Sequence, residues 1–279
     1  MKWLVAVGIP AILAGLSVLL LARHYRAAPM ERTEIYHGVY LRVEQLPDTP
    51  EGSGRLMVVE VHWDTPGVEL RNRNYSYAVN PLNPHYRLAN ADWSLWKEGA
   101  SVLVNTTTYH PSEFYKAIPG LPVRSGETVV VEGVPSHVHE HSYLMYWDRD
   151  MNAHMLRHKP PDPQSLKDAV LGIGVQGVPI SEGQTRFQAM GYVDEVMPRT
   201  FIGFDPTRNI LYLLAFEKAS GRVMLHKALE AGVVFGAMMD CGGSTSLLIG
   251  RDANGVPAHT GIRGWRPLGS YLMVNADPL

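Results

Sequence analysis

The segment of this 279-residue chain best suited to chemistry is an acidic residue that follows an apolar run and precedes a glycine turn. Residues 233–239 are almost all apolar, which predicts a buried strand. Asp240 follows this strand, and the turn at residues 242–245 begins with two glycines that allow a sharp bend and expose amide N–H groups. The turn ends with a serine and a threonine. A carboxylate, a glycine turn and hydroxyls at a strand end are typical of a site for sugars or phosphates.

Three more polar residues carry groups suited to such a ligand. Arg199 has a permanently charged guanidinium that can bind two phosphate oxygens in parallel, and Arg266 offers the same group. Asn105 ends an apolar run, and its amide both donates and accepts, which suits sugar hydroxyls. Each also has a structural explanation. Arg199 could form an ion pair with a nearby carboxylate, Arg266 could belong to a simple turn with a stacked side chain, and Asn105 and Asp240 could accept backbone N–H groups in turns.

A histidine-rich segment raises the question of a metal. In an extended chain alternate residues share a face, so His137, His139 and His141 would point the same way, as zinc ligands can. We interpret them instead as a solvated polar face, because their spacing is not that of the known zinc hydrolases. The sequence therefore predicts no metal and no cofactor. A metal-dependent hydrolase built on this segment is the more distant alternative.

Composition excludes some classes of function. The formal net charge is −2 and the basic residues are scattered along the chain, so we expect no nucleic-acid partner. Cys241 is the single cysteine and cannot form an internal disulfide, so the fold does not depend on oxidation.

The N-terminal residues predict a membrane segment. Residues 3–22 are uncharged and mostly apolar, which is about the length that crosses a bilayer. A cleaved signal peptide is the alternative, although its apolar core is usually shorter, about 7–15 residues. The flanking positive charges are nearly balanced and do not fix an orientation. We therefore divide the chain into an anchor or signal peptide with its flank, residues 1–29, and one domain, residues 30–279.

The elements that must position these residues are mostly short strands separated by Gly and Pro. The strands expected besides residues 233–239 are 55–61, 101–105, 128–131, 142–147, 200–204, 210–216, 246–249 and 271–274. The expected helices are few: residues 90–97, 165–171 and 222–231, the last closed by Gly232. The fold class is therefore α+β, a single mixed-sheet domain with few helices, preceded by an N-terminal transmembrane helix.

Several segments, taken together, resemble the phosphodiester glycosidase family, whose members include bacterial envelope proteins. Residues 240–245 read Asp-x-Gly-Gly-Ser-Thr, and residues 266–269 read Arg-Pro-x-Gly. Residues 198–203 resemble the family's Pro-Arg-Thr-x-x-Gly segment, and residues 100–105 resemble the strand that carries its Asn. An early Pro-Gly turn at residues 66–70 also matches. The resemblance extends over residues 36–274.

The family implies hydrolysis of a sugar-1-phosphodiester on envelope or exopolysaccharide glycans. Bond cleavage at an anomeric carbon passes through an oxocarbenium-like transition state, which a carboxylate stabilises. The resemblance assigns this role to Asp240 and the phosphate to Arg199, and it implies that Asn105, Arg199 and Asp240 meet at a common sheet edge. We expect Asp205 to be a second carboxylate of the site. The substrate-binding residues that it implies are Asn105, Gly242, Gly243, Ser244, Thr245 and Arg266.

The chain departs from the family in two places. The family usually has glycines after its Asn, where this chain has Thr106 and Thr107, and it usually has glycine at the position of Cys241. This departure favours the main alternative, a non-catalytic envelope protein that binds a glycan or a phosphate polymer. In both cases the resemblance implies a domain outside the cytoplasm. Residues 3–22 would anchor it in the membrane, or the domain would be secreted if this segment is cleaved.

Overall fold

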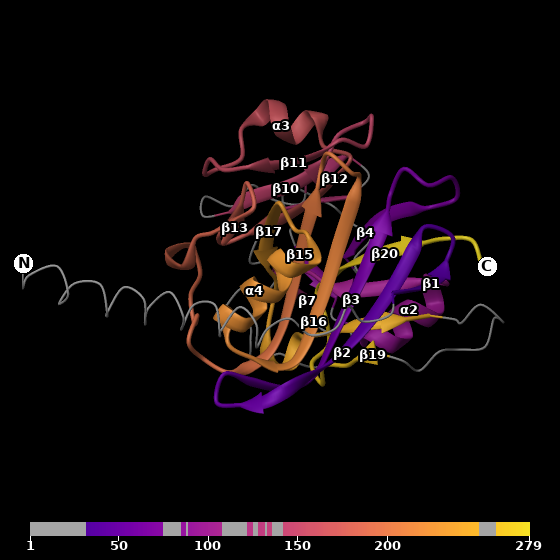
Figure 1. The fold of residues 1–279 in the computed structure, drawn as a ribbon. Coiled ribbons are helices and arrows are strands. Elements are labelled where there is room, and N and C mark those ends of the chain that lie inside the picture. Colours follow the sequence, from indigo (N-terminus) through magenta and orange to yellow (C-terminus); the bar gives the residue numbers. More distant parts are fainter. Residues whose placement is uncertain are drawn as a thin grey trace, which may run out of the picture. The chain divides into compact units, whose positions relative to one another are not determined.

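The computed structural model describes residues 32–74, 85–87, 89–107, 122–124, 128–131, 133–135, 142–250 and 261–279 (Figure 1). The predicted membrane segment at residues 3–22 and the histidines at 137–141 lie outside these residues. Within the described ranges no helix is both long enough and apolar enough to span a membrane. The described ranges give a sheet-rich α+β fold with few helices, as the sequence predicts.

Strands dominate the described residues, where they form three larger sheets and one pair. The largest sheet has the order β1 (Thr33–Tyr36), β2 (Val39–Thr49), β3 (Gly52–His62), β16 (Ile210–Ala219), β15 (Met197–Asp205), β17 (Phe235–Met238), β13 (Ile180–Ser181), β14 (Gln184–Thr185). The second has the order β11 (Ala153–Leu156), β10 (Tyr143–Trp147), β12 (Leu171–Val175), β8 (Val129–Val131), β9 (Val134–Pro135). The third has the order β19 (Gly261–Ile262), β18 (Leu247–Ile249), β6 (Val102–Asn105), β20 (Ser270–Asn275), β4 (Glu69–Asn74). The pair is β5 (His85–Arg87) with β7 (Pro122–Arg124).

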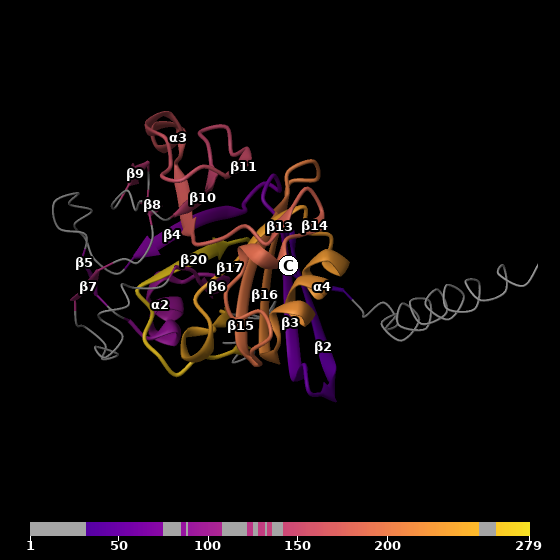
Figure 2. The same cartoon turned by 90° about the vertical axis from the view of Figure 1, so that its left-hand side faces the viewer.

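Strand β15 is covered on both faces because its apolar side chains alternate. Ile202 and Phe204 lie in a core shared with residues of the other two large sheets. Phe201, the residue before Ile202, points to the opposite face and lies in a second core under helix α4 (Gly221–Ala231). Figure 2 shows α4 lying against this sheet. A strand buried on both faces is held firmly, which suits it to position a site.

Helix α4 ends where the sequence predicts. The Ser220 side chain accepts a hydrogen bond from the Val223 N–H at its start. Gly232 closes the helix in the left-handed conformation, with φ of 106°, and its N–H turns back to the carbonyls of the last turn. Helix α2 (Ala91–Glu98) also agrees with the expectation to within a residue at each end.

Helix α3 (Pro163–Asp168) begins earlier and ends earlier than the expected residues 165–171. The Asp162 carboxylate accepts from the Ser165 N–H at 2.8 Å, and Pro163 occupies the first helical position. Leu171 belongs instead to strand β12. The cap and the proline, not the apolar spacing, determine where this helix starts. Two 3₁₀ turns, η2 (Phe187–Ala189) and η3 (Gly242–Ser244), complete the described elements.

Lys227 joins helix α4 to strand β2 through a buried ion pair, which gives a stability prediction. Its ammonium lies 2.6 Å from Glu44 Oε1 and 2.9 Å from Glu230 Oε2. Lys227→Met would leave the Glu44 carboxylate buried without its partner. We therefore expect the free energy of unfolding, measured by urea denaturation, to fall by about 3 kcal/mol. Arg222→Ala, on the same helix, breaks an exposed pair with Asp194 and should cost less than about 1 kcal/mol. Equal losses in the two variants would contradict this account.

Candidate functional site

Three segments that are distant in sequence meet at the turn after β17. The Asn105 amide Nδ2 donates to the backbone carbonyl of Asp240 at 2.7 Å. The Asp240 N–H in turn donates to the Thr106 carbonyl at 2.9 Å, and the Met239 N–H donates to the Thr200 carbonyl at 2.9 Å. The end of β6, the start of β15 and the Asp240 turn are thus joined by direct hydrogen bonds. The expected convergence of Asn105 and Asp240 is present.

Asn105 holds these segments together from within. Its Oδ1 accepts from the Thr200 hydroxyl at 2.7 Å and from the Ser246 N–H at 2.8 Å, and the residue is 1% exposed. A carbonyl oxygen has two lone pairs, so this oxygen has no capacity left for a ligand. The geometry therefore makes Asn105 a positioning residue for Asp240. Its expected contact with a sugar stays a prediction.

The two threonines that replace the family's glycines are also turned inward. Thr106 Oγ1 lies 2.8 Å from the Ser270 hydroxyl, and Thr107 Oγ1 lies 2.6 Å from the same oxygen. All three residues are buried. The added side chains therefore tie β6 to β20, and they leave the backbone of Thr106 free to accept the Asp240 N–H.

Asp240 is partly exposed at the surface, yet protein surrounds most of its carboxyl group. Burial raises its pKa above the usual 3.8, while Ser244, the positive charge of Arg266 and the Cys241 N–H act in the opposite direction and only partly offset it. A carboxyl whose pKa is raised in this way is suited to take part in proton transfer or to react at a charged centre.

The glycine turn beside Asp240 needs both its glycines, for different reasons. Gly242 has φ of 67°, a conformation that side chains disfavour. A Cβ on Gly243 would lie 2.6 Å from the Trp265 ring, so that ring packs directly on the turn. The Arg266 N–H donates to the Gly243 carbonyl at 2.9 Å, which fixes the Arg-Pro segment to the same turn.

Two hydroxyls of the turn are buried. The Thr245 Oγ1 has no hydrogen-bond partner within the described residues, which is unusual for a buried polar atom. Ser244 Oγ likewise makes no hydrogen bond of ordinary geometry there, although it lies near enough to Asp240 to favour the charged carboxylate. Both residues are 1% exposed, so the turn has hydrogen-bonding capacity that its own fold does not use.

Arg199 lies close to this cluster, but its guanidinium points into the protein. Nε donates to the Ala219 carbonyl at 2.8 Å, and Nη2 donates to the carbonyls of Tyr192 at 2.5 Å and Glu195 at 2.6 Å. Burial lowers the pKa of the guanidinium from its ordinary value, although the neighbouring Cys241 sulfur acts in the opposite direction. The side chain is fully buried. These contacts give Arg199 a scaffold role. Its partners are carbonyl oxygens, whereas the structural explanation offered from the sequence was an ion pair with a carboxylate.

Cys241 is enclosed next to Arg199. Its thiol lies 3.2 Å from the Met239 carbonyl, and burial raises its pKa to about 12. A thiol with so high a pKa is protonated at neutral pH and is a poor nucleophile. The cysteine that stands in place of the family's glycine therefore packs against the scaffold.

Asp205 does not join the cluster, which corrects its expected place as a second carboxylate. It ends β15, whereas Thr200 and Arg199 lie near the start of that strand. Its carboxylate accepts from the Thr207 N–H at 2.9 Å and pairs with Arg208 at 2.5 Å. Burial would raise its pKa, but these bonds outweigh burial, and the pKa is lowered. Asp205 closes the turn to β16.

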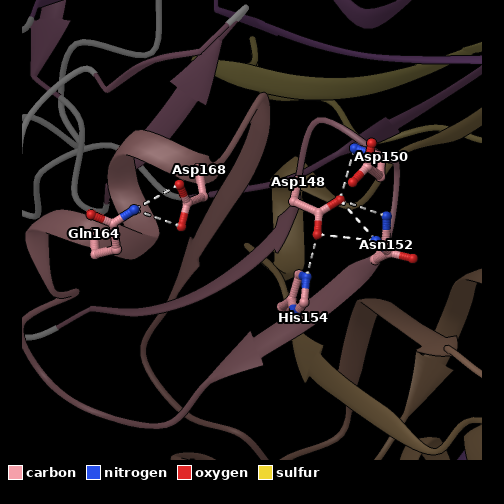
Figure 3. A network of polar contacts seen from close by, with 6 residues as sticks. All are labelled: Asp148, Asp150, Asn152, His154, Gln164 and Asp168. Carbon is pink, nitrogen blue, oxygen red and sulfur yellow. Dashed lines mark hydrogen bonds and ion pairs between the residues drawn. The ribbon is translucent and has the colours of Figure 1, made fainter.

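A second polar network belongs to a hairpin of another sheet (Figure 3). The Asp148 carboxylate accepts from the N–H groups of Asp150 and Asn152 and lies 2.8 Å from His154 Nε2. These contacts together hold the turn between β10 and β11. On α3, Gln164 Nε2 donates to Asp168. Among the described residues no group of His, Cys, Asp or Glu is arranged to hold a metal ion.

Comparison with known families identifies the class of protein. The phosphodiester glycosidase (NAGPA) family matches residues 98–275, which include Asn105, Arg199 and the whole Asp240 turn. The chain belongs to this family. The resemblance inferred from its motifs is thereby confirmed.

Solved structures share the fold. The catalytic domain of zebrafish N-acetylglucosamine-1-phosphodiester alpha-N-acetylglucosaminidase, auto-inhibited by its pro-peptide, matches with a TM-score of 0.62 at 14% identity, over 88% of this chain and 87% of that one. A hypothetical protein from Synechocystis matches with a TM-score of 0.59 at 12% identity, over 90% and 64%. A putative exported protein from Burkholderia pseudomallei K96243 matches with a TM-score of 0.52 at 11% identity, over 80% and 74%. Comparison with curated proteins gives no match.

Sequence reasoning missed two residues that shape the site. Thr200, next to Arg199, binds Asn105, and its place inside the Pro-Arg-Thr segment was the available signal. Trp265 packs on Gly243, and the Arg266 guanidinium stacks over the Trp265 ring, 5.5 Å from its centre. This stacking is the arrangement that the sequence offered as the structural explanation of Arg266.

Proposed function

We propose that this protein hydrolyses a glycosyl phosphodiester at the Asp240 turn and releases a sugar and a phosphate monoester. The observation that carries the proposal is the environment of Asp240 in a member of this family. Its carboxyl group is enclosed, its pKa is raised, and its backbone is fixed by Asn105 beside two buried hydroxyls. A carboxyl group used only to brace a turn would more often have a lowered pKa, as Asp205 has.

The reaction needs most stabilisation at the anomeric carbon. As the bond from this carbon to the phosphate oxygen breaks, positive charge develops on the sugar, and an ionised Asp240 opposite it would stabilise that charge or activate a water. The leaving phosphate monoester is a weak base, so it needs little help from a general acid. The positive charge of Arg266 acts on the Asp240 carboxyl group, so Arg266 is the better placed arginine for the phosphate. Ser244 and Thr245 are the donors proposed for sugar or phosphate oxygens.

The substrate and the location are part of the proposal. The zebrafish structure is named for a glycosidase that acts on N-acetylglucosamine-1-phosphodiester, which makes this sugar the first probe to use. The apolar residues 3–22 and the exported protein with the same fold favour a domain outside the cytoplasm, attached through an N-terminal membrane segment. A glycan of the envelope or of an exopolysaccharide is then the substrate class.

The test is incubation of the protein with the methyl ester of N-acetylglucosamine-1-phosphate, with and without a chelator. The proposal predicts release of free sugar that the chelator does not change. Binding of the ester without turnover would overturn the proposal in favour of the glycan-binding alternative, to which the threonines after Asn105 point. Turnover abolished by the chelator would instead favour a metal-dependent hydrolase.

The pH dependence of activity tests the coupling of Arg266 to Asp240. If ionised Asp240 is required, kcat/KM falls on the acid side as its carboxylate takes up a proton. Arg266 lowers the pKa of Asp240, and Arg266→Gln removes that influence. The acid limb of the profile, where kcat/KM falls with falling pH, should therefore move to higher pH. Arg263→Gln removes an equal charge that is paired with Asp92, and its acid limb should stay in place. An unmoved limb in Arg266→Gln would contradict the assignment.

A further inference from the structure

Two tryptophans stand out among the exposed apolar side chains. Trp265 is 78% exposed and Trp96 is 76% exposed, although tryptophan is usually among the more buried residues. Neither ring is needed for the cores: the buried side of α2 is formed by Ala91 and Ser94, with Leu95 packed on the third sheet's core. Exposed aromatic surface beside a candidate site is typical of ligand recognition.

Trp265 is held rigidly at the edge of the Asp240 turn. Its ring lies on Gly243, where the missing Cβ leaves room for it. The backbone on either side is fixed, because the Gly264 N–H donates to the Ser246 hydroxyl at 3.2 Å and the Arg266 N–H donates to the Gly243 carbonyl at 2.9 Å. One side of the ring is therefore supported by protein while most of its surface stays in solvent. A preorganised ring of this kind binds at little cost in conformational entropy.

The segment that carries Trp265 is attached to helix α2. Arg263 pairs with Asp92 near the start of the helix at 2.7 Å, and Ala89 and Leu268 form a β-bridge. Trp96 lies four residues after Asp92, about one helical turn or roughly 6 Å further along the axis. The two exposed rings thus belong to structures that are directly connected, and they lead from the Asp240 turn onto the helix.

We propose that Trp265 and Trp96 are successive stacking surfaces for the sugar rings of a glycan chain whose reacting end lies at Asp240. Pyranose rings have an apolar C–H face that packs on an aromatic ring, and their hydroxyls are left to water or to polar neighbours. The Arg263–Asp92 ion pair joins the segment of Trp265 to the helix of Trp96, and on that helix the Lys97 ammonium lies over the Trp93 ring. Such charges suit a hydroxylated polymer better than a continuous apolar partner surface. The protein would therefore act on a polymeric glycan and not only on a small phosphodiester.

The inference rests on the proposed function only for the placement of the reacting end, so binding is tested separately from turnover. Linear N-acetylglucosamine oligomers of one, three and six residues are titrated into the Asp240→Asn protein, and affinity is followed by tryptophan fluorescence and calorimetry. We expect the hexamer to bind at least tenfold more tightly than the monomer. Adding Trp265→Ala should weaken every oligomer, and adding Trp96→Ala should weaken the hexamer about tenfold while leaving the monomer unchanged.

The control is Tyr40→Ala, which removes a partly exposed ring of β2 that contacts His62 edge-on, three strands from β15. It should change no affinity. Affinity independent of length, or a Trp96→Ala protein that binds the hexamer as well as its parent does, would overturn the inference. So would self-association or vesicle binding that Trp96→Ala abolishes, since the helix face would then have a different occupant. Length-dependent binding of the oligomers, together with a wild type that does not hydrolyse the methyl ester of N-acetylglucosamine-1-phosphate, would overturn the proposed function and leave this inference standing.

Discussion

Asp240→Asn is expected to abolish hydrolysis of a glycosyl phosphodiester and, at neutral pH, to raise the melting temperature. The substitution keeps the size of the side chain and its ability to accept the Cys241 N–H, but it removes the charge. Loss of a carboxylate that acts at the reacting centre costs on the order of a thousandfold or more in kcat. If Asp240 only braced the glycine turn, the amide would replace it and activity would survive.

The stability effect follows from the sign of the pKa shift. The folded protein raises the pKa of Asp240 above 3.8, so it holds the proton more tightly than the unfolded chain does. The ionised carboxylate therefore costs stability at all pH values above the raised pKa, and this cost disappears below 3.8, where both states are protonated. Asp240→Asn should recover that stability at pH 7 and show no gain below about pH 3.8.

Asp205→Asn is the matched control, because Asp205 ends β15 and lies outside the Asp240 cluster. The folded protein lowers the pKa of Asp205, so its charge contributes stability above the unfolded pKa, and this contribution is lost as pH falls through the folded value. The variant should melt at a lower temperature at pH 7, with no loss of kcat in the protein that remains folded. Similar turnover in Asp240→Asn and wild type would remove Asp240 from the reaction.

Arg199→Lys is expected to destabilise the protein strongly and to reduce activity on charged and neutral substrates alike. The guanidinium donates to three carbonyl oxygens and contacts the Met238 sulfur at 3.1 Å, all in the interior. One ammonium cannot reach this set, so buried acceptors are left without donors. Breaking a buried charged network costs on the order of 3–5 kcal/mol, which corresponds to roughly 10 °C in a domain of this size.

The measurement pairs thermal melting with kcat/KM on two substrates: the phosphodiester and a neutral aryl glycoside of the same sugar. A scaffold role predicts equal losses on both and a lower melting temperature. A loss confined to the phosphodiester, with an unchanged melting temperature, would place Arg199 at the phosphate after all.

The sequence predicts best the elements whose pattern is local. The apolar runs of β15 and β16 and the glycine that closes α4 were recognised because buried strands and helix caps leave clear signals. Strand β2 was missed, since it mixes charged residues with a proline at Pro47 and lies toward the sheet edge. Helix α3 was displaced because its start depends on the Asp162 cap and not on apolar spacing.

The candidate site was predictable only in part, because a strand's position does not reveal where its side chains point or how far apart its ends lie. Asn105 and Asp240 were expected together and are joined by a hydrogen bond. Arg199 and Asp205 share β15, yet six residues of extended chain separate them by about 20 Å. That Arg199 points inward depends on the carbonyls of Tyr192 and Glu195, which come from a loop whose path no local pattern encodes.

The central claim is that this protein breaks the bond between the anomeric carbon and oxygen at the Asp240 turn. The most direct test is hydrolysis of the methyl ester of N-acetylglucosamine-1-phosphate in water enriched in ¹⁸O, followed by mass spectrometry of both products. The account predicts ¹⁸O at the anomeric hydroxyl of the released sugar, an unlabelled methyl phosphate, and neither product from Asp240→Asn. Label in the phosphate would mean attack at phosphorus, and it would contradict a glycosidase at this site.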